Sequence, residues 1–142
     1  MFEITNIFWY SLNKEGGDLM AIQESGEMYL ENIFVLKKQN GNVRSIDVAH
    51  YSGYSKPSVS RAMSILKKDG YITIDQDGFI NFTQEGLSIA QEIYERHIVL
   101  SDFLMAIGVN EQTAKDDACK IEHDLSVESF QKLKEHIAKT IK

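Results

Sequence analysis

Three potential metal ligands lie close together in residues 116–124, Asp-Asp-Ala-Cys-Lys-Ile-Glu-His-Asp. On a helix, Cys119, Glu122 and His123 stand at positions i, i+3 and i+4, so their side chains project from one face. A thiolate, a carboxylate and an imidazole together form a mixed site suited to a first-row transition metal. The spacing therefore predicts a metal site on a helix in the last third of the chain.

Residues elsewhere in the chain are candidates to complete this site. His97 could supply a second imidazole from the preceding predicted helix, and Met28 and Glu31, three positions apart on the first predicted helix, share a face. Each residue also has an ordinary structural explanation, since a lone histidine is usually not a ligand, and Met28 and Cys119 could be core residues. The spacing alone leaves both interpretations open.

The composition is that of a globular protein, with 43% hydrophobic and 25% charged residues and no apolar run of membrane-spanning length. A single cysteine excludes an internal disulfide and fits a cytoplasmic location. The net charge of -6 is unevenly distributed, because residues 20–83 carry seven basic and seven acidic residues, whereas residues 84–142 carry seven and eleven. The middle segment is therefore the least repelled by phosphate, and the acidic last segment is the better place for a cation.

Hydrophobic spacing, caps and turns predict a mainly helical chain. Ser45 is the expected N-cap of a short helix, Pro57 fits the first turn of the next helix, and Asp69-Gly70 ends that helix. Two β-rich runs around a glycine-containing turn then predict a hairpin. The predicted helices span residues 25–38, 46–51, 56–68, 84–107, 110–124 and 126–142, and the predicted strands span residues 71–74 and 79–82.

A helix–turn–helix followed directly by a hairpin is typical of a winged helix, whose second helix enters the major groove of DNA. The polar face of the helix over residues 56–68 would contact phosphates and bases, with Arg61 able to bind guanine or phosphate. The alternative is a solvated amphipathic helix. Asp75 and Asp77, at the tip of the wing, would be repelled by phosphate. The predicted DNA-contacting residues are Lys56, Ser58, Ser60, Arg61, Ser64 and Lys67.

From Ser25 to about Ser126 the sequence resembles the diphtheria toxin repressor and manganese transport regulator family of metal-dependent repressors. The stretches that carry the resemblance, in the same order and at matching distances, are 27–33, 69–71, Leu87, 96–97, 107–109 and 119–126. The resemblance implies a winged-helix DNA-binding domain, a helical dimerisation domain, and Fe²⁺ or Mn²⁺ that promotes operator binding at metal-uptake genes.

The resemblance also implies particular ligands. Met28, Cys119, Glu122 and His123 match the primary site of the iron-responsive branch, and Glu31 and His97 match ligands of the manganese-responsive branch. Ser101 and Lys115 stand where the iron branch has the carboxylate and imidazole of a second site, which puts that site in doubt. The chain thus combines an iron-type ligand set with the short organisation of the manganese branch, without a third domain.

The expected organisation is a winged-helix domain over residues 20–83 and a helical metal-binding and dimerisation domain over residues 84–142. The expected partners are double-stranded operator DNA and a second copy of the chain, with no membrane. An apolar stripe near the end of the long helix predicts the dimer core, formed by Val99, Phe103, Leu104 and Ile107.

Residues 1–19 are expected to be a translated leader. Lys14-Glu15-Gly16 can be encoded by the purine-rich signal that precedes a bacterial start codon, and Met20 follows at a suitable distance. The alternative is a genuine amphipathic extension that packs on the body of the protein.

Two other functions compete with a metal-dependent repressor. One is a metal-independent winged-helix regulator that senses a small ligand, or redox state through Cys119. The other is a metal-dependent enzyme, which is disfavoured because no nucleophile–base pair and no glycine-rich phosphate loop is evident.

Overall fold

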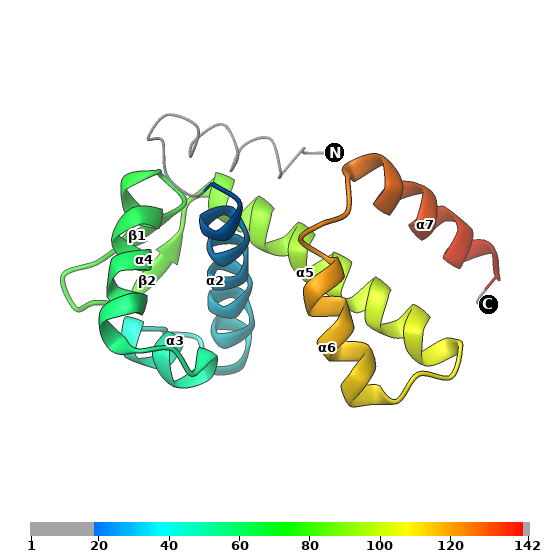
Figure 1. Ribbon diagram of the computed structural model, residues 1–142. Helices are drawn as coiled ribbons and strands as arrows, with labels where there is room; N and C mark the ends of the chain where they lie inside the picture. The colour runs from blue at the N-terminus through cyan, green and yellow to red at the C-terminus, as the bar shows by residue number, and fades with distance from the viewer. Residues whose placement is uncertain (1–18, 141–142) are drawn as a thin grey trace. The chain divides into compact units, whose positions relative to one another are not determined.

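The computed structural model describes residues 19–140, and in this range the chain is mainly helical, as predicted (Figure 1). By close contacts, residues 19–91 form one compact unit and residues 92–140 form a second. We call them the N-terminal and C-terminal units and describe each by itself. The elements are α2 (Leu19–Asn40), α3 (Ser45–Ser52), α4 (Lys56–Lys68), β1 (Ile72–Ile74), β2 (Ile80–Phe82), α5 (Gln84–Ala106), α6 (Glu111–Ile121) and α7 (Val127–Thr140).

The first helix is longer than predicted. It begins at Leu19 rather than at Ser25, because good helix-forming residues precede Ser25 and the helix passes through Gly26. Apart from Leu19, the predicted leader over residues 1–19 lies outside the described residues. No helix among the residues that the structure describes is long and apolar enough to cross a membrane.

The N-terminal unit has the predicted helix–turn–helix, in which α3 and α4 pack against α2. Ser55 caps α4 by accepting a hydrogen bond from the backbone amide of Ser58 (3.3 Å), and Pro57 lies in the first turn. The prediction that Ser45 caps α3 is wrong, since the cap is Arg44, whose amide donates to the Asp47 carboxylate (2.8 Å). The core of this unit is formed by Leu30, Ile33, Leu36, Val43, Val48, Ala49, Val59, Met63, Leu66, Tyr71, Ile72 and Ile80.

The predicted hairpin is present, with β1 and β2 antiparallel and Thr73 opposite Asn81. Its turn is held by Asp75, whose Oδ1 accepts hydrogen bonds from the amides of Asp77 and Phe79, both at 2.9 Å. Gly78 takes the left-handed conformation that closes the turn (φ +83°). Asp75 at the tip of the wing is therefore a structural requirement of the turn.

The base of the hairpin is joined to the start of α5 by Thr83. Its hydroxyl donates to the Gly70 carbonyl (2.6 Å) and accepts a hydrogen bond from the amide of Gly86 (3.2 Å). Gly86 approaches the hairpin so closely that a Cβ there would lie 1.8 Å from the carbonyl oxygen of Tyr71. Only glycine fits at this crossing of α5 and the hairpin.

The C-terminal unit consists of the later part of α5 with α6 and α7. Its core includes Ile93, Leu100, Ala114, Ala118 and Phe130. The predicted cap of α7 is confirmed, because Ser126 Oγ accepts a hydrogen bond from the amide of Ser129 (3.0 Å). The helix α6 ends at Ile121, before its predicted end at residue 124, and a turn follows it.

Candidate metal centre and nucleic-acid interface

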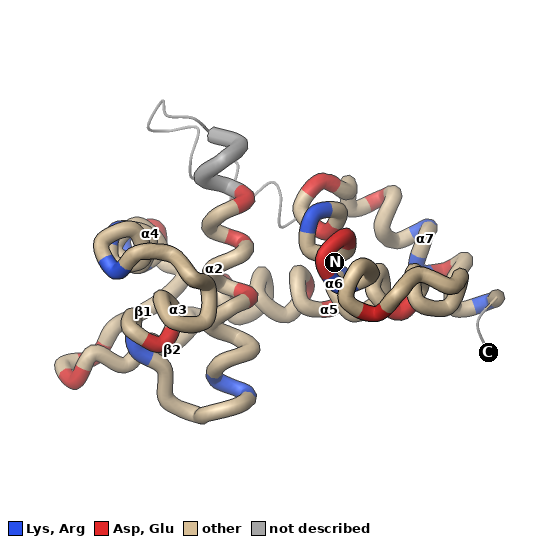
Figure 2. Tube along the Cα trace, turned by 60° about the horizontal axis from the view of Figure 1, so that its bottom comes forward, with Lys and Arg blue, Asp and Glu red and all other residues tan. Residues whose placement is uncertain are grey.

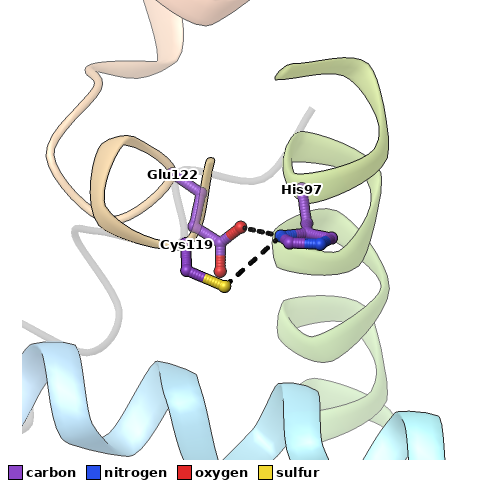
Figure 3. A group of neighbouring side chains, drawn as sticks. All are labelled: His97, Cys119 and Glu122. Carbon is purple, nitrogen blue, oxygen red and sulfur yellow. Dashed lines mark hydrogen bonds and ion pairs between the residues drawn. The ribbon is translucent and has the colours of Figure 1, made fainter. Parts of the chain in front are cut away.

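Three of the predicted ligands meet in the C-terminal unit, where His97 on α5 faces Cys119 and Glu122 at the end of α6 (Figure 3). His97 Nδ1 lies 2.9 Å from Glu122 Oε2 and 3.6 Å from Cys119 Sγ. Glu122 is buried, and Cys119 is exposed. The three donor atoms lie within 4.8 Å of one another.

This donor set fits a divalent transition metal. Metal bonds of about 2.0–2.3 Å to nitrogen, oxygen and sulfur place neighbouring donors in a tetrahedral site roughly 3.5 Å apart. The observed separations lie around that value. Nitrogen, oxygen and sulfur donors together are also the mixture that first-row transition metals bind.

Two of the predicted ligands, Glu122 and His123, lie just after the last residue of α6. Glu122 is the C-cap of α6 and keeps helical backbone angles (φ −58°, ψ −30°), so it remains on the same face as Cys119. His123 follows in the turn rather than on the helix, which corrects the prediction that all three residues project from a regular helix. Its Nε2 still lies 3.4 Å from the second oxygen of Glu122, Oε1.

A buried arginine, which the sequence patterns did not single out as functional, contacts this turn. Arg96 is 1% exposed, and its Nη1 donates hydrogen bonds to the carbonyl oxygens of Glu122 (3.0 Å) and Leu125 (2.6 Å). Arg96 precedes His97 in the chain, so it appeared only as part of a matching stretch. The helical period does place residue 96 on the same face as Ile93 and Leu100, which is a signal for an inward-facing arginine.

The remaining predicted ligands and the doubtful second site lie as follows. Met28 and Glu31 stand one turn apart on α2 in the N-terminal unit, where Glu31 is buried and Met28 half-buried.

Ser101 is buried on α5, and its hydroxyl donates to the backbone carbonyl of His97. Lys115 is exposed and donates to Glu111 (2.7 Å), a contact whose hydrogen bond and charge lower the pKa of Glu111. Ser101 and Lys115 are thus both engaged in local contacts.

The predicted DNA-contacting residues all lie exposed along α4. Val59, Met63 and Leu66 occupy the buried side of the helix. The exposed side carries Lys56, Ser58, Ser60, Arg61, Ser64 and Lys67. Figure 2 shows basic residues on α4 and acidic residues in the hairpin turn. This unit therefore offers its positive charge on the helix rather than on the wing.

The predicted dimer stripe lies along the end of α5. Val99, Phe103 and Leu104 are half-buried, and Ile107 is 63% exposed. Ile98, which the prediction did not include, is 40% exposed. The end of α5 thus exposes apolar surface at Ile98 and Ile107.

Family models match both units of the chain. Residues 21–78 match the N-terminal DNA-binding domain of iron-dependent repressors. Residues 83–140 match the iron-dependent repressor domain described as metal-binding and dimerisation domain.

Among curated proteins, an uncharacterized HTH-type transcriptional regulator of Methanocaldococcus jannaschii is 30% identical over 115 residues, covering 80% of this chain and 92% of that protein. The HTH-type transcriptional regulator MntR of Geobacillus thermodenitrificans is 35% identical over 102 residues, covering 72% of each. Both relatives are described as transcriptional regulators, which agrees with the family models.

Solved structures share the fold. The metal-dependent transcriptional regulator MtsR aligns with a TM-score of 0.74 at 24% identity over 80% of this chain. A manganese-dependent transcriptional repressor in complex with manganese aligns with a TM-score of 0.73 at 22% identity, again over 80% of this chain. The aligned chain spans about half of these two structures, 53% and 52%. They support the same succession of winged helix and helical domain.

Proposed function

Since this chain belongs to the family of iron-dependent repressors, we propose that it represses metal-uptake genes by binding their operator DNA as a homodimer when Fe²⁺ or Mn²⁺ is bound. The observation that carries the proposal is the convergence of His97, Cys119 and Glu122 in the domain that the family model describes as metal-binding. A metal-independent regulator gives no reason for three such donors to meet.

The metal would be held by six residues. In the C-terminal unit these are His97, Cys119, Glu122 and His123. Met28 and Glu31 on α2 are included because of the expectation from the sequence. The bound metal supplies positive charge to a cluster that includes the buried carboxylate of Glu122. A metal that binds more tightly in the DNA-competent arrangement of the protein would shift the population towards that arrangement.

The two expected domains would have different roles. Residues 20–83 form the winged-helix domain that would contact DNA through α4, with Arg61 as the base-reading residue. Residues 84–142 form the domain that would bind metal and dimerise through the stripe at the end of α5. A homodimer presents two recognition helices, which suits an operator with two half-sites. We place the protein in the cytoplasm, among transcriptional regulators rather than enzymes.

The proposal can be tested by selecting the DNA sequences that the protein binds from a random pool. A pool of random-sequence duplexes is incubated with the full chain and Fe²⁺ or Mn²⁺ in anaerobic, reducing buffer, and the bound duplexes are sequenced after several rounds. The expected result is a two-fold symmetric sequence that the protein binds with metal and releases with chelator. Equal binding with metal and with chelator would contradict the proposal.

A further inference from the structure

We propose that Arg96 is a positioning residue of the metal centre. Its buried guanidinium holds the turn after α6 in the conformation in which Glu122 contacts both His97 and His123. This inference rests on the proposed function, because it concerns the same metal site. It assigns a role to a residue that would not itself contact the metal.

The contacts of Arg96 point to the turn rather than to another acidic side chain. One nitrogen, Nη1, donates to the carbonyls of Glu122 (3.0 Å) and Leu125 (2.6 Å), which bracket His123. The nearest carboxylate with which it forms an ion pair, Glu92, lies at 4.0 Å, the limit of such a contact. The guanidinium also lies over the ring of Phe130 on α7, 5.1 Å from its centroid. Arg96 therefore joins the turn to α5 and also contacts α7.

The end of α6 needs such a partner. The last carbonyl groups of a helix have no amide partner within the helix, and they carry partial negative charge that a cationic side chain stabilises. Arg96 satisfies the carbonyls of Glu122 and Leu125 from a neighbouring helix. The turn is otherwise held by backbone hydrogen bonds from the amides of Glu122, Asp124 and Leu125 to α6. These bonds fix the helix end but do not tie it to α5.

The consequence for the site is geometric. His97 follows Arg96 directly on α5, so the same turn of α5 provides a metal ligand and an anchor for the turn that carries two others. Glu122 places one oxygen 2.9 Å from His97 and the other 3.4 Å from His123. Without the hydrogen bonds of Arg96, the turn would be free to move, and both distances would vary. Groups that orient metal ligands typically contribute about 10- to 100-fold to metal affinity.

A purely structural role for Arg96 is the competing explanation. Burying a guanidinium is costly, and the hydrogen bonds that offset this cost are those of Nη1 to the turn, since Nε and Nη2 have none within the described residues. Arg96→Met keeps the length and the packing of the side chain but removes the donors to the turn. Arg96→Lys keeps the charge and some donor capacity but loses the planar fork. Lys134→Met is the matched control, since Lys134 links α7 to Glu95 on α5 without contacting the turn.

The first measurement is amide hydrogen exchange in the metal-free protein. In Arg96→Met, the amides of Glu122, Asp124 and Leu125 should exchange faster than in the natural chain. The amide of Ala114, bonded to Asn110 at the start of α6, should be unchanged. Arg96→Lys should lie between the two, and Lys134→Met should match the natural chain. Unchanged exchange in the turn, or equally faster exchange throughout the unit, would overturn the positioning role.

The second measurement is anaerobic titration with Co²⁺, followed by the thiolate-to-cobalt absorption of Cys119. Arg96→Met should bind Co²⁺ about 10- to 100-fold more weakly than the natural chain, and Lys134→Met equally well. Equal affinity of Arg96→Met would overturn the inference, and so would loss of cooperative thermal unfolding in both Arg96 variants, since the residue would then act on the whole fold. If the natural chain itself bound no Co²⁺, the proposed function would fail, while the exchange experiment would still decide the role of Arg96.

Discussion

Replacing Arg61 with alanine should weaken specific DNA binding much more than non-specific binding. Arg61 lies exposed on α4, and its guanidinium carries five donors, against one on each neighbouring serine. The hydroxyl of Ser64 already donates within the helix, to the carbonyl of Ser60 (3.0 Å). Arg61 is therefore the side chain on this face best able to form a bidentate contact with guanine.

The size of the effect follows from the two copies of α4 in a homodimer. A bidentate contact to a base contributes about 1–3 kcal/mol of discrimination. Two half-sites would then lose about 2–6 kcal/mol, which corresponds to an affinity on the order of 30- to 10⁴-fold lower. Lys67→Ala should behave differently, because a phosphate contact is lost equally on every sequence and the salt dependence becomes shallower.

Fluorescence anisotropy with the selected duplex and a scrambled duplex, each at two salt concentrations, measures both effects. Lys132→Ala is the control, because Lys132 is an exposed lysine (75%) on α7, away from α4 in the chain. An equal loss of affinity for the selected and scrambled duplexes in Arg61→Ala would show that Arg61 contacts phosphate only. No loss on either duplex would refute the assignment of this face of α4 to DNA.

Three further predictions concern the metal and the fold. Glu122→Ala combined with His123→Ala should abolish metal-stimulated DNA binding while circular dichroism shows an intact fold; retained stimulation in a gel-shift assay would rule out the proposed ligands. Because Met28 and Cys119 are sulfur donors, which favour Fe²⁺ over Mn²⁺, the natural chain should respond to Fe²⁺ at lower free concentration than to Mn²⁺, and Met28→Asp with Cys119→Glu should shift the balance towards Mn²⁺. Anaerobic DNA titrations against buffered metal measure this, and a natural chain that responds to Mn²⁺ first would contradict it. Gly86→Ala should destabilise the protein by about 1–3 kcal/mol, since its Cβ would lie 1.8 Å from the Tyr71 carbonyl; chemical unfolding with Gln91→Ala as an exposed control tests this, and equal stability would show that α5 shifts freely at this point.

Local signals predicted the winged helix well because several of them agreed. In α4, the hydrophobic spacing, a proline in the first turn and an Asp-Gly end all mark the same 13 residues. The hairpin was equally well marked by two apolar runs around Gly78. Where a signal stood alone the prediction failed, as with Ser45, because the carboxylate of Asp47 offered the Arg44 amide a competing cap. The extension of α2 to Leu19 was missed because Ser25 resembles a cap but lies within a favourable helical sequence.

Helical periodicity predicted Cys119 and Glu122 on one face, whereas His97 was a candidate chiefly because of the family resemblance. Cys119 and Glu122 are three residues apart, and this spacing survives the end of α6 because Glu122 keeps helical backbone angles. The approach of His97 to these residues depends on how α5 packs against α6, which no local pattern encodes. The role of Arg96 could not be predicted from the sequence either, because it depends on how the helices pack. Both of its hydrogen-bond acceptors are backbone carbonyls more than 25 residues away. Backbone acceptors carry no residue-specific signature in a sequence.

The fastening of the hairpin base by Thr83 bears on how such a protein could change during evolution. Thr83 binds Gly70 across the base, so the residues between them form a loop whose ends are already held together. Lengthening a closed loop costs little, about 0.6 kcal/mol for each doubling of its length. Insertions at the tip, around residues 76 and 77, would therefore leave α4 and the start of α5 in place. The tip is thus the part of this unit where length and charge can vary without disturbing the helices, provided that Asp75 or an equivalent acceptor still closes the turn.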